Sequence, residues 1–144
     1  RICLEFGEFT HIKSLVEAKN FLHAVDHPAA GILIDLMHIN RSGEVLPNLE
    51  NPIFPYIQGC DFWQSSANMI GDNYIEAAVD SRCCLGDGEA RLEDIMKVCR
   101  SNIDVSLEIR SRALREKFPN PLERAKVIFD GCDRRDFFGK KGIV

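Results

Sequence analysis

The stretch from Gly31 to Gly43 constrains the possible fold of this chain more than any other segment. It begins with an apolar run, Gly31 to Met37, that is typical of a strand buried on both faces, and it ends on a glycine that can close a turn. Asp35 and His38 stand where the run becomes polar. In a parallel α/β protein this point is the C-terminal end of a strand, where ligands bind. We therefore interpret Asp35 as a candidate metal ligand, with the cap of a following helix as the alternative.

Hydrophobic periodicity predicts an α/β fold over the whole chain. Expected strands cover residues 2–6, 31–37, 52–58 and 103–109, and expected helices cover residues 14–26, 68–79, 90–101 and a segment that starts at Asn120-Pro121. A short helix at residues 46–50 is a weaker expectation. Residues 110–118 are expected to form a charged connection, and residues 139–142 a solvated tail. Repeated strand, crossover and strand units favour a parallel sheet.

The composition excludes several classes of protein. The chain has 144 residues, of which 45% are hydrophobic and 28% charged, as expected for one globular domain. A formal net charge of −4 provides no broad basic field, so general nucleic-acid binding is not expected. No apolar run approaches the roughly 20 residues that a membrane helix needs, and no signal peptide is recognisable. We expect an intracellular, cytoplasmic protein that has no membrane partner.

The six cysteines lack the paired short spacing of a zinc site and are interpreted as reduced thiols. Cys83 and Cys84 are adjacent, and a redox pair is the alternative interpretation. Adjacent cysteines rarely form a disulfide without strain, so we favour free thiols.

Each expected strand ends on a residue that can bind a hard cation. These residues are Glu5, Asp35, Gln58 and Glu108. Parallel strands of one sheet present their ends side by side, so residues far apart in the sequence can converge on one ion. Three anionic oxygens and one neutral oxygen suit Mn²⁺ or Mg²⁺ best, with Co²⁺ or Zn²⁺ as further options. The sequence therefore predicts a divalent metal centre.

Several segments, in order along the chain, carry a family resemblance. Residues 3–6, 34–38, 57–61, 80–82 with 86–89, and 107–109 resemble the C-terminal half of the xylose-isomerase-like sugar phosphate isomerase/epimerase superfamily. The resemblance implies half of a (β/α)8 TIM barrel, with four parallel strands and crossover helices. It also implies that the four predicted ligands lie on the fifth to eighth strands of the barrel.

The same resemblance implies substrate-binding residues. His38 matches a position that contacts substrate, and Arg82 matches an arginine that binds substrate oxygens. Leu85 and Asp87 replace the usual Pro and Glu of the glycine-rich turn that follows. Gln58 stands where epimerases often have His, and related dehydratases also have Gln at this position. The alternatives are a loop histidine for His38 and a surface ion pair with Asp80 or Asp87 for Arg82.

The long segment from Gly59 to Gly88 has no clean period, and loops of this length are usually functional or disordered. We therefore predict that Asp61 and Trp63 bind substrate. Packing of Phe62 and Trp63 in the core or in the loop is the alternative.

The leading functional hypothesis is a metal-dependent isomerase or epimerase that converts a small sugar or sugar phosphate through an enediolate. Glu5 and Glu108 would act both as ligands and as the bases that move the proton. One alternative is a metal-dependent dehydratase of a cyclic polyol or a dehydroshikimate-like substrate. Another is a barrel that binds a ligand without catalysis. A nuclease is disfavoured, because zinc nucleases of this fold use several histidine ligands and the chain has four histidines, only one at a strand end.

Four strands leave the edges of a barrel sheet unpaired. We therefore expect residues 1–144 to form one partial domain. An N-terminal half-barrel elsewhere in the polypeptide, or a second copy in a homo-oligomer, would complete it.

Overall fold

The computed structural model describes residues 1–67, 69–90, 94 and 103–133. The chain divides into two compact units, which are Arg1–Gly59 with Glu93–Leu107 and Cys60–Leu92 with Glu108–Val144. The predicted single domain stays a prediction. Of the predicted helix over residues 90–101, only Ala90 and Asp94 are described, and the predicted tail at 139–142 lies outside the described residues.

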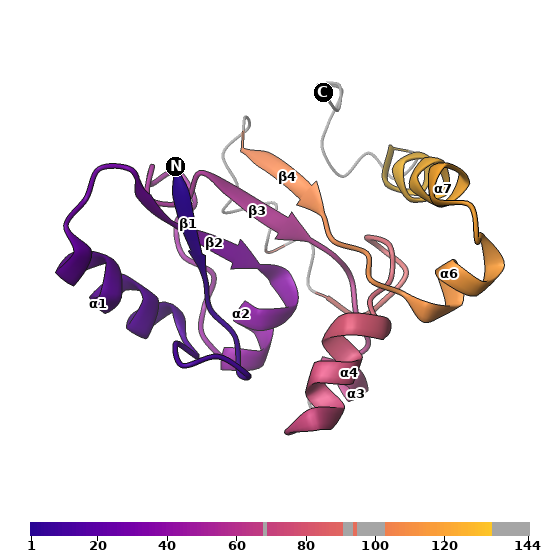
Figure 1. Ribbon diagram of the computed structural model, residues 1–144, viewed down its shortest axis with the longest axis horizontal. Helices are drawn as coiled ribbons and strands as arrows, with labels where there is room; N and C mark the ends of the chain where they lie inside the picture. Colours follow the sequence, from indigo (N-terminus) through magenta and orange to yellow (C-terminus); the bar gives the residue numbers. More distant parts are fainter. Residues whose placement is uncertain (68, 91–93, 95–102, 134–144) are drawn as a thin grey trace. The chain divides into compact units, whose positions relative to one another are not determined.

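A four-stranded parallel sheet forms the centre of the first unit (Figure 1). Its strands lie in the order of the sequence, as β1 (Ile2–Glu5), β2 (Ala30–Asp35), β3 (Tyr56–Gly59) and β4 (Asp104–Leu107). Each neighbouring pair is parallel, which confirms the predicted sheet. The C-terminal ends of these strands therefore share one edge of the sheet.

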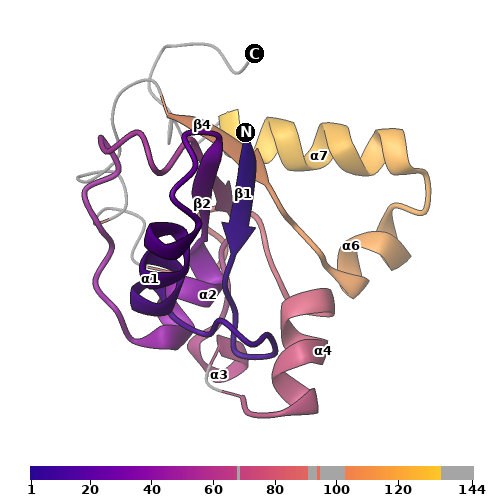
Figure 2. The ribbon, with the colours of Figure 1, turned by 60° about the vertical axis from the view of Figure 1, so that its left-hand side comes forward.

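Helix α1 (Leu15–Val25) covers the sheet beside β2 (Figure 2). It begins after Ser14, whose side chain accepts a hydrogen bond from the Glu17 amide, and it ends at Asp26 in the left-handed conformation. The predicted helix over residues 14–26 is thus confirmed, with its two outermost residues serving as caps. Its apolar face buries Leu15, Ala18 and Leu22.

Strand β2 ends at Asp35, two residues earlier than predicted. Leu36 and Met37 instead open helix α2 (Leu36–Ser42), which the sequence analysis did not predict. Both side chains are buried, so a run of apolar residues could not distinguish the end of the strand from the start of the helix. Gly43 closes α2 in the left-handed conformation, as its predicted turn role requires.

The predicted third strand begins late. Residues 52–55 precede β3, which starts only after Pro55, and a proline contributes no amide to a sheet. No helix forms at residues 46–50, so that expectation is wrong. Asn48 and Asn51 accept hydrogen bonds from the Glu50 and Ile53 amides and hold the segment in turns.

Helices α3 (Gln64–Ala67), α4 (Asp72–Asp80), α6 (Arg112–Lys117) and α7 (Pro121–Asp133) belong to the second unit. The helix predicted at 68–79 is present as α4, which starts later than predicted, after Gly71. The expected charged connection at 110–118 contains α6, which begins after Ser111, whose hydroxyl accepts a hydrogen bond from the Leu114 amide. The predicted start of α7 at Pro121 is confirmed. Among the described residues no helix is both long enough and apolar enough to cross a membrane.

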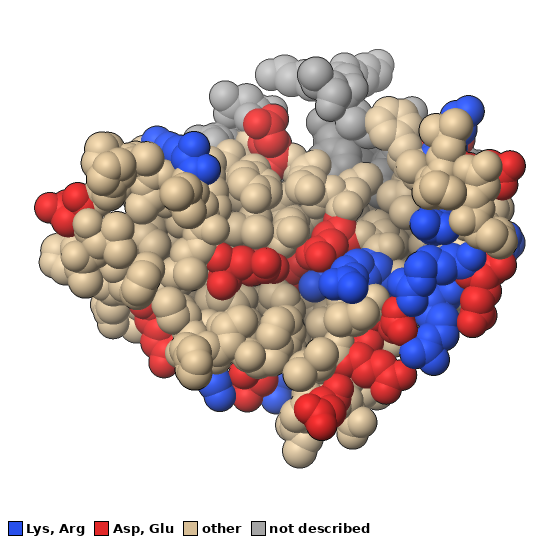
Figure 3. All heavy atoms as spheres, in the orientation of Figure 1, with Lys and Arg blue, Asp and Glu red and all other residues tan. Residues whose placement is uncertain are grey.

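Helices α4 and α6 are joined by surface ion pairs. Figure 3 shows basic atoms over α6 beside acidic atoms over α4. Arg112 contacts Asp80 at 2.8 Å and Glu76 at 3.1 Å, and Arg115 also pairs with Asp80. Hydrogen bonds from Arg115 and then Arg112 lower the pKa of the Asp80 carboxyl below its ordinary value of 3.8. Asp80 therefore favours the folded state most when it is ionised.

Replacing Asp80 with Asn should lower the Tm modestly at neutral pH, because exposed ion pairs contribute little to stability. The lowered pKa fixes the sign of the pH dependence. The contribution is complete above pH 3.8 and is lost as the pH falls through the still lower pKa of the folded state. Thermal unfolding of wild type and Asp80→Asn from pH 7 to pH 2 should show two curves that converge in acid. Glu116→Gln, at an exposed position of α6, is the control, and a gap that widens in acid would contradict the assignment.

Candidate metal centre

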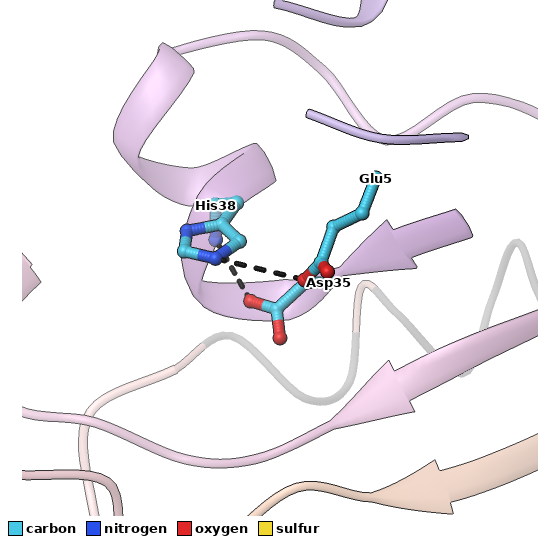
Figure 4. Close-up of side chains that lie close together, drawn as sticks. All are labelled: Glu5, Asp35 and His38. Carbon is cyan, nitrogen blue, oxygen red and sulfur yellow. Dashed lines mark hydrogen bonds and ion pairs between the residues drawn. The ribbon is translucent and has the colours of Figure 1, made fainter. Parts of the chain in front are cut away.

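Glu5, Asp35 and His38 meet at the C-terminal edge of the sheet (Figure 4). Each offers one ligand atom, and these atoms all lie within 4.8 Å of one another. Glu5 is the last residue of β1, Asp35 is the last residue of β2, and His38 lies in the first turn of α2. Nε2 of His38 is 3.7 Å from Oε1 of Glu5. The three residues form a group that can hold a metal ion.

Asp35 is both a helix cap and a member of this group. Its Oδ1 accepts hydrogen bonds from the Met37 amide at 2.9 Å and from the His38 amide at 3.0 Å. The alternative interpretation of Asp35 as a cap is therefore correct in itself. The cap does not separate Asp35 from the group, because its carboxylate also offers a ligand atom within 4.8 Å of those of Glu5 and His38. The side chain is 1% exposed, and the cap fixes its direction.

The register of the sheet brings Gln58 to the same face. Gln58 pairs with Asp35 across β2 and β3, and Glu5 pairs with Leu33, two residues before Asp35. Because side chains alternate along a strand, Glu5, Asp35 and Gln58 point to one face of the sheet. Oε1 of Gln58 is buried and has no hydrogen-bond partner among the described residues. An unpaired buried acceptor is costly, and a cation or a ligand donor would satisfy it.

These donors fit a divalent cation. Two carboxylates and an amide oxygen are hard ligands of the kind that Mg²⁺ and Mn²⁺ prefer, and an imidazole also suits Zn²⁺. None of the grouped side chains is a thiolate. The chemistry of the site therefore agrees with a divalent metal and leaves its identity open.

The second unit holds the other predicted site residues, including Glu108, which directly follows the last residue of β4. Arg82 is buried, and its Nη1 lies 3.6 Å from Oε2 of Glu108 and 3.2 Å from Sγ of Cys60. Its Nε donates to the carbonyl of Ala78 at 2.8 Å. The alternative of a surface ion pair for Arg82 is therefore wrong. The roles of Arg82 in substrate binding and of Glu108 as ligand and base stay predictions.

Asp61 organises the loop of the second unit. Its Oδ1 accepts hydrogen bonds from the amides of Phe62 and Ala90, both at 2.8 Å, and its Oδ2 accepts one from the Gly86 amide at 2.9 Å. With a side chain 1% exposed and both oxygens occupied, Asp61 has the contacts of a structural residue. These contacts give no support to its predicted substrate binding.

Phe62 is buried, in agreement with the packing alternative, whereas Trp63 is half-exposed and its predicted role in substrate binding stays a prediction. Among the described residues none of the cysteines Cys3, Cys60, Cys83 and Cys84 forms a disulfide, in agreement with their interpretation as reduced thiols.

Sequence reasoning missed Phe9, whose ring meets His38 edge-on with a centroid separation of 5.3 Å. The only available signal was its position four residues after Glu5, in a loop that follows a strand end. It also missed Glu44, whose carboxylate accepts hydrogen bonds from the Leu15 and Val16 amides at the start of α1.

No protein-family model matches the sequence, and no curated protein matches it. Solved structures do resemble it. Over its whole length the chain superposes on a zinc-containing IolI protein with a TM-score of 0.73 and 16% identity. Over 88% of its length it superposes on a probable 3-DHS dehydratase, AsbF, from Bacillus anthracis, with a TM-score of 0.60 and 21% identity.

A third similar structure is a fusion of a xylose isomerase-like TIM barrel with 4-hydroxyphenylpyruvate dioxygenase, with a TM-score of 0.60 and 19% identity over the whole chain. The chain spans 51%, 48% and 24% of these three proteins. It thus has the fold of half of a xylose isomerase-like TIM barrel, as predicted from the resemblance of its motifs.

Proposed function

We propose that this chain supplies the metal-binding half of an isomerase or epimerase that acts on a small sugar or polyol. The observation that carries the proposal is the convergence of Glu5, Asp35 and His38 within 4.8 Å at the edge of the sheet. Oε1 of Gln58 supports it, because this buried atom has no hydrogen-bond partner among the described residues and a cation would provide one. The proposal rests on this donor set, since similarity at 16–21% identity concerns the fold.

In the proposed reaction the protein removes a proton from the carbon next to the carbonyl of a ketose or of a ketone-bearing polyol, and returns it to the neighbouring carbon or to the opposite face of the same carbon. A divalent ion would supply Lewis-acid stabilisation of the negative charge that develops on the substrate oxygens. Asp35 and Gln58 would hold the ion. Glu5, with a partly exposed side chain, would bind it and accept the substrate proton. His38 would donate a hydrogen bond that orients a substrate oxygen.

The described residues favour an unphosphorylated substrate. Helix N-termini and glycine-rich turns are the usual backbone sites for phosphate. Here the start of α1 is capped by Glu44 and Ser14, and the start of α2 by Asp35. Asp61 already accepts hydrogen bonds from the Gly86 amide of the glycine-rich turn and from the Ala90 amide that follows the turn. Helix α4 lacks a side-chain cap, but Asp72 in its first turn repels an anion.

A second half-barrel would complete the sheet. Strands β1 and β4 each have one neighbouring strand among the described residues, and the chain spans about half of the IolI protein. Further strands of the same polypeptide, or a second copy of the chain, would pair with these edges. The native mass of the purified protein distinguishes the two arrangements.

Calorimetric titration with Mn²⁺ tests the metal binding on which the proposal depends. We expect one saturable site per completed barrel, followed by turnover of at least one member of a panel of ketoses and cyclic polyols. The product mass separates isomerisation, which leaves it unchanged, from dehydration, which lowers it by one water. A protein that is folded but binds no Mn²⁺ would contradict the proposal and favour a barrel that only binds a ligand.

A further inference from the structure

An aromatic side chain lies beside the candidate metal centre. The ring of Phe9 meets the imidazole of His38 at 5.3 Å between centroids, with an interplanar angle of 79°. This T-shaped arrangement is the favourable one for two aromatic rings. His38 in turn belongs to the group with Glu5 and Asp35. Phe9 therefore contacts the residue of the group that is proposed to orient the substrate.

The loop that carries Phe9 is fixed by its own hydrogen bonds. The Gly7 amide donates to the carbonyl of Ile12 at 3.0 Å, and the Thr10 amide donates to the carbonyl of Gly7 at 2.9 Å. The Thr10 hydroxyl also lies within hydrogen-bond distance of both carbonyls. A Cβ on Gly7 would lie 3.6 Å from the imidazole of His38, so the backbone of the loop passes close to that ring. The backbone on both sides of Phe9 is thus held by hydrogen bonds within the loop.

Despite its contact with His38, Phe9 is not buried by the described residues. Its side chain is 47% exposed, although it contacts a histidine that is only 4% exposed. Ligand sites combine exposed aromatic faces of this kind with a few convergent polar groups. The exposed part of the ring is the surface that a bound molecule could cover.

We propose that Phe9 is a specificity-determining residue that contacts the substrate, with its ring against the C–H face of a neutral sugar or cyclic polyol. This inference rests on the proposed function, because it assumes that the substrate lies at the Glu5, Asp35 and His38 group. Hydroxyl groups on one side of such a molecule would reach the polar group. Carbon-bound hydrogens on the other side carry partial positive charge and would meet the negative face of the ring.

The test measures binding of unreactive or slowly reacting probes to the Mn²⁺-loaded protein. Myo-inositol and D-fructose are titrated while the relaxation of their protons by bound Mn²⁺ is recorded, which reports binding near the ion. We expect Phe9→Ala to weaken probe binding about fivefold, as expected for the loss of one aromatic contact. Phe9→Trp keeps an aromatic face and should bind within about twofold of wild type.

Phe21→Ala is the matched control, because Phe21 is 49% exposed but lies on helix α1. It should bind the probes as wild type does. Mn²⁺ affinity and Tm, measured on every variant, separate loss of the contact from loss of the metal or of the fold.

The outcomes distinguish the two proposals. Equal probe binding by wild type and Phe9→Ala would overturn the role of Phe9 and leave the metal centre standing. Wild type that binds Mn²⁺ but neither probe would also overturn it. Wild type that binds no Mn²⁺ would overturn the proposed function and this inference together.

Discussion

Replacing Asp35 with Asn is expected to abolish tight Mn²⁺ binding while the chain keeps its fold. Asn is as good a helix cap as Asp, so it can still accept hydrogen bonds from the Met37 and His38 amides. It cannot supply the negative charge that attracts the ion. Losing an outer-shell partner of a metal ligand costs about 10- to 100-fold in affinity, and losing a ligand should cost more. Titration calorimetry with Mn²⁺ measures the change directly.

Two further variants show which function of Asp35 is responsible. Asp35→Ala removes the cap as well as the charge, so it should lose Mn²⁺ binding and also about 1 kcal/mol of stability. Glu50→Gln, at an exposed position of the first unit, removes a carboxylate away from the group and should change neither property. If Asp35→Asn bound Mn²⁺ as tightly as wild type, Asp35 would be a helix cap and nothing more.

The sequence was sufficient to predict the sheet and the edge at which the group forms. Period-two and apolar runs marked all four strands, and the strand ends identified Glu5 and Asp35 before any contact was known. The parallel order followed from crossover lengths. This prediction was possible because a crossover connection between two successive strands makes them run in the same direction. Once all strands run parallel, their ends must share one edge.

Contacts that depend on tertiary structure could not be predicted in this way. Helix α2 was missed because Leu36 and Met37 are as apolar as the strand before them. The pairing of Arg82 with Glu108 joins residues 26 positions apart, and no local period encodes it. The ring of Phe9 was missed for the same reason, since a single aromatic residue in a polar loop carries no pattern.

Asp35 and Asp61 show why residue type alone does not assign a function. Both are 1% exposed, and both accept hydrogen bonds from backbone amides. In Asp35 the two amide hydrogen bonds go to one oxygen, whereas in Asp61 three amides occupy both oxygens. The neighbours of the carboxylate therefore distinguish the two residues: Asp35 lies with Glu5 and His38 in a group within 4.8 Å, whereas three backbone amides meet the carboxylate of Asp61.

Replacing Asp61 with Ala is expected to cause the largest loss of stability of any single change considered. The substitution leaves the amides of Phe62, Gly86 and Ala90 without their acceptor. A buried amide left unsatisfied costs about 1–3 kcal/mol, and the Gly86 and Ala90 amides are only partly buried, so the free energy of unfolding should fall by roughly 2–3 kcal/mol. Urea unfolding measures this loss, and Glu116→Gln, at an exposed position of α6 in the same unit, is the control. A change below about 1 kcal/mol would show that the loop does not depend on Asp61.

A substitution at Gly88 tests the packing of the same loop in a second way. A Cβ at this position would lie 2.5 Å from Oδ1 of Asp61 and 2.7 Å from the carbonyl oxygen of Phe62, so Gly88→Ala must displace the carboxylate or the backbone. We expect it to cost about 1–3 kcal/mol in the wild-type background. With Asp61 already replaced by Ala, the clash with the carboxylate is gone and the cost of Gly88→Ala should be smaller. A double-mutant cycle measures this coupling, and strictly additive losses would contradict direct contact between the two residues.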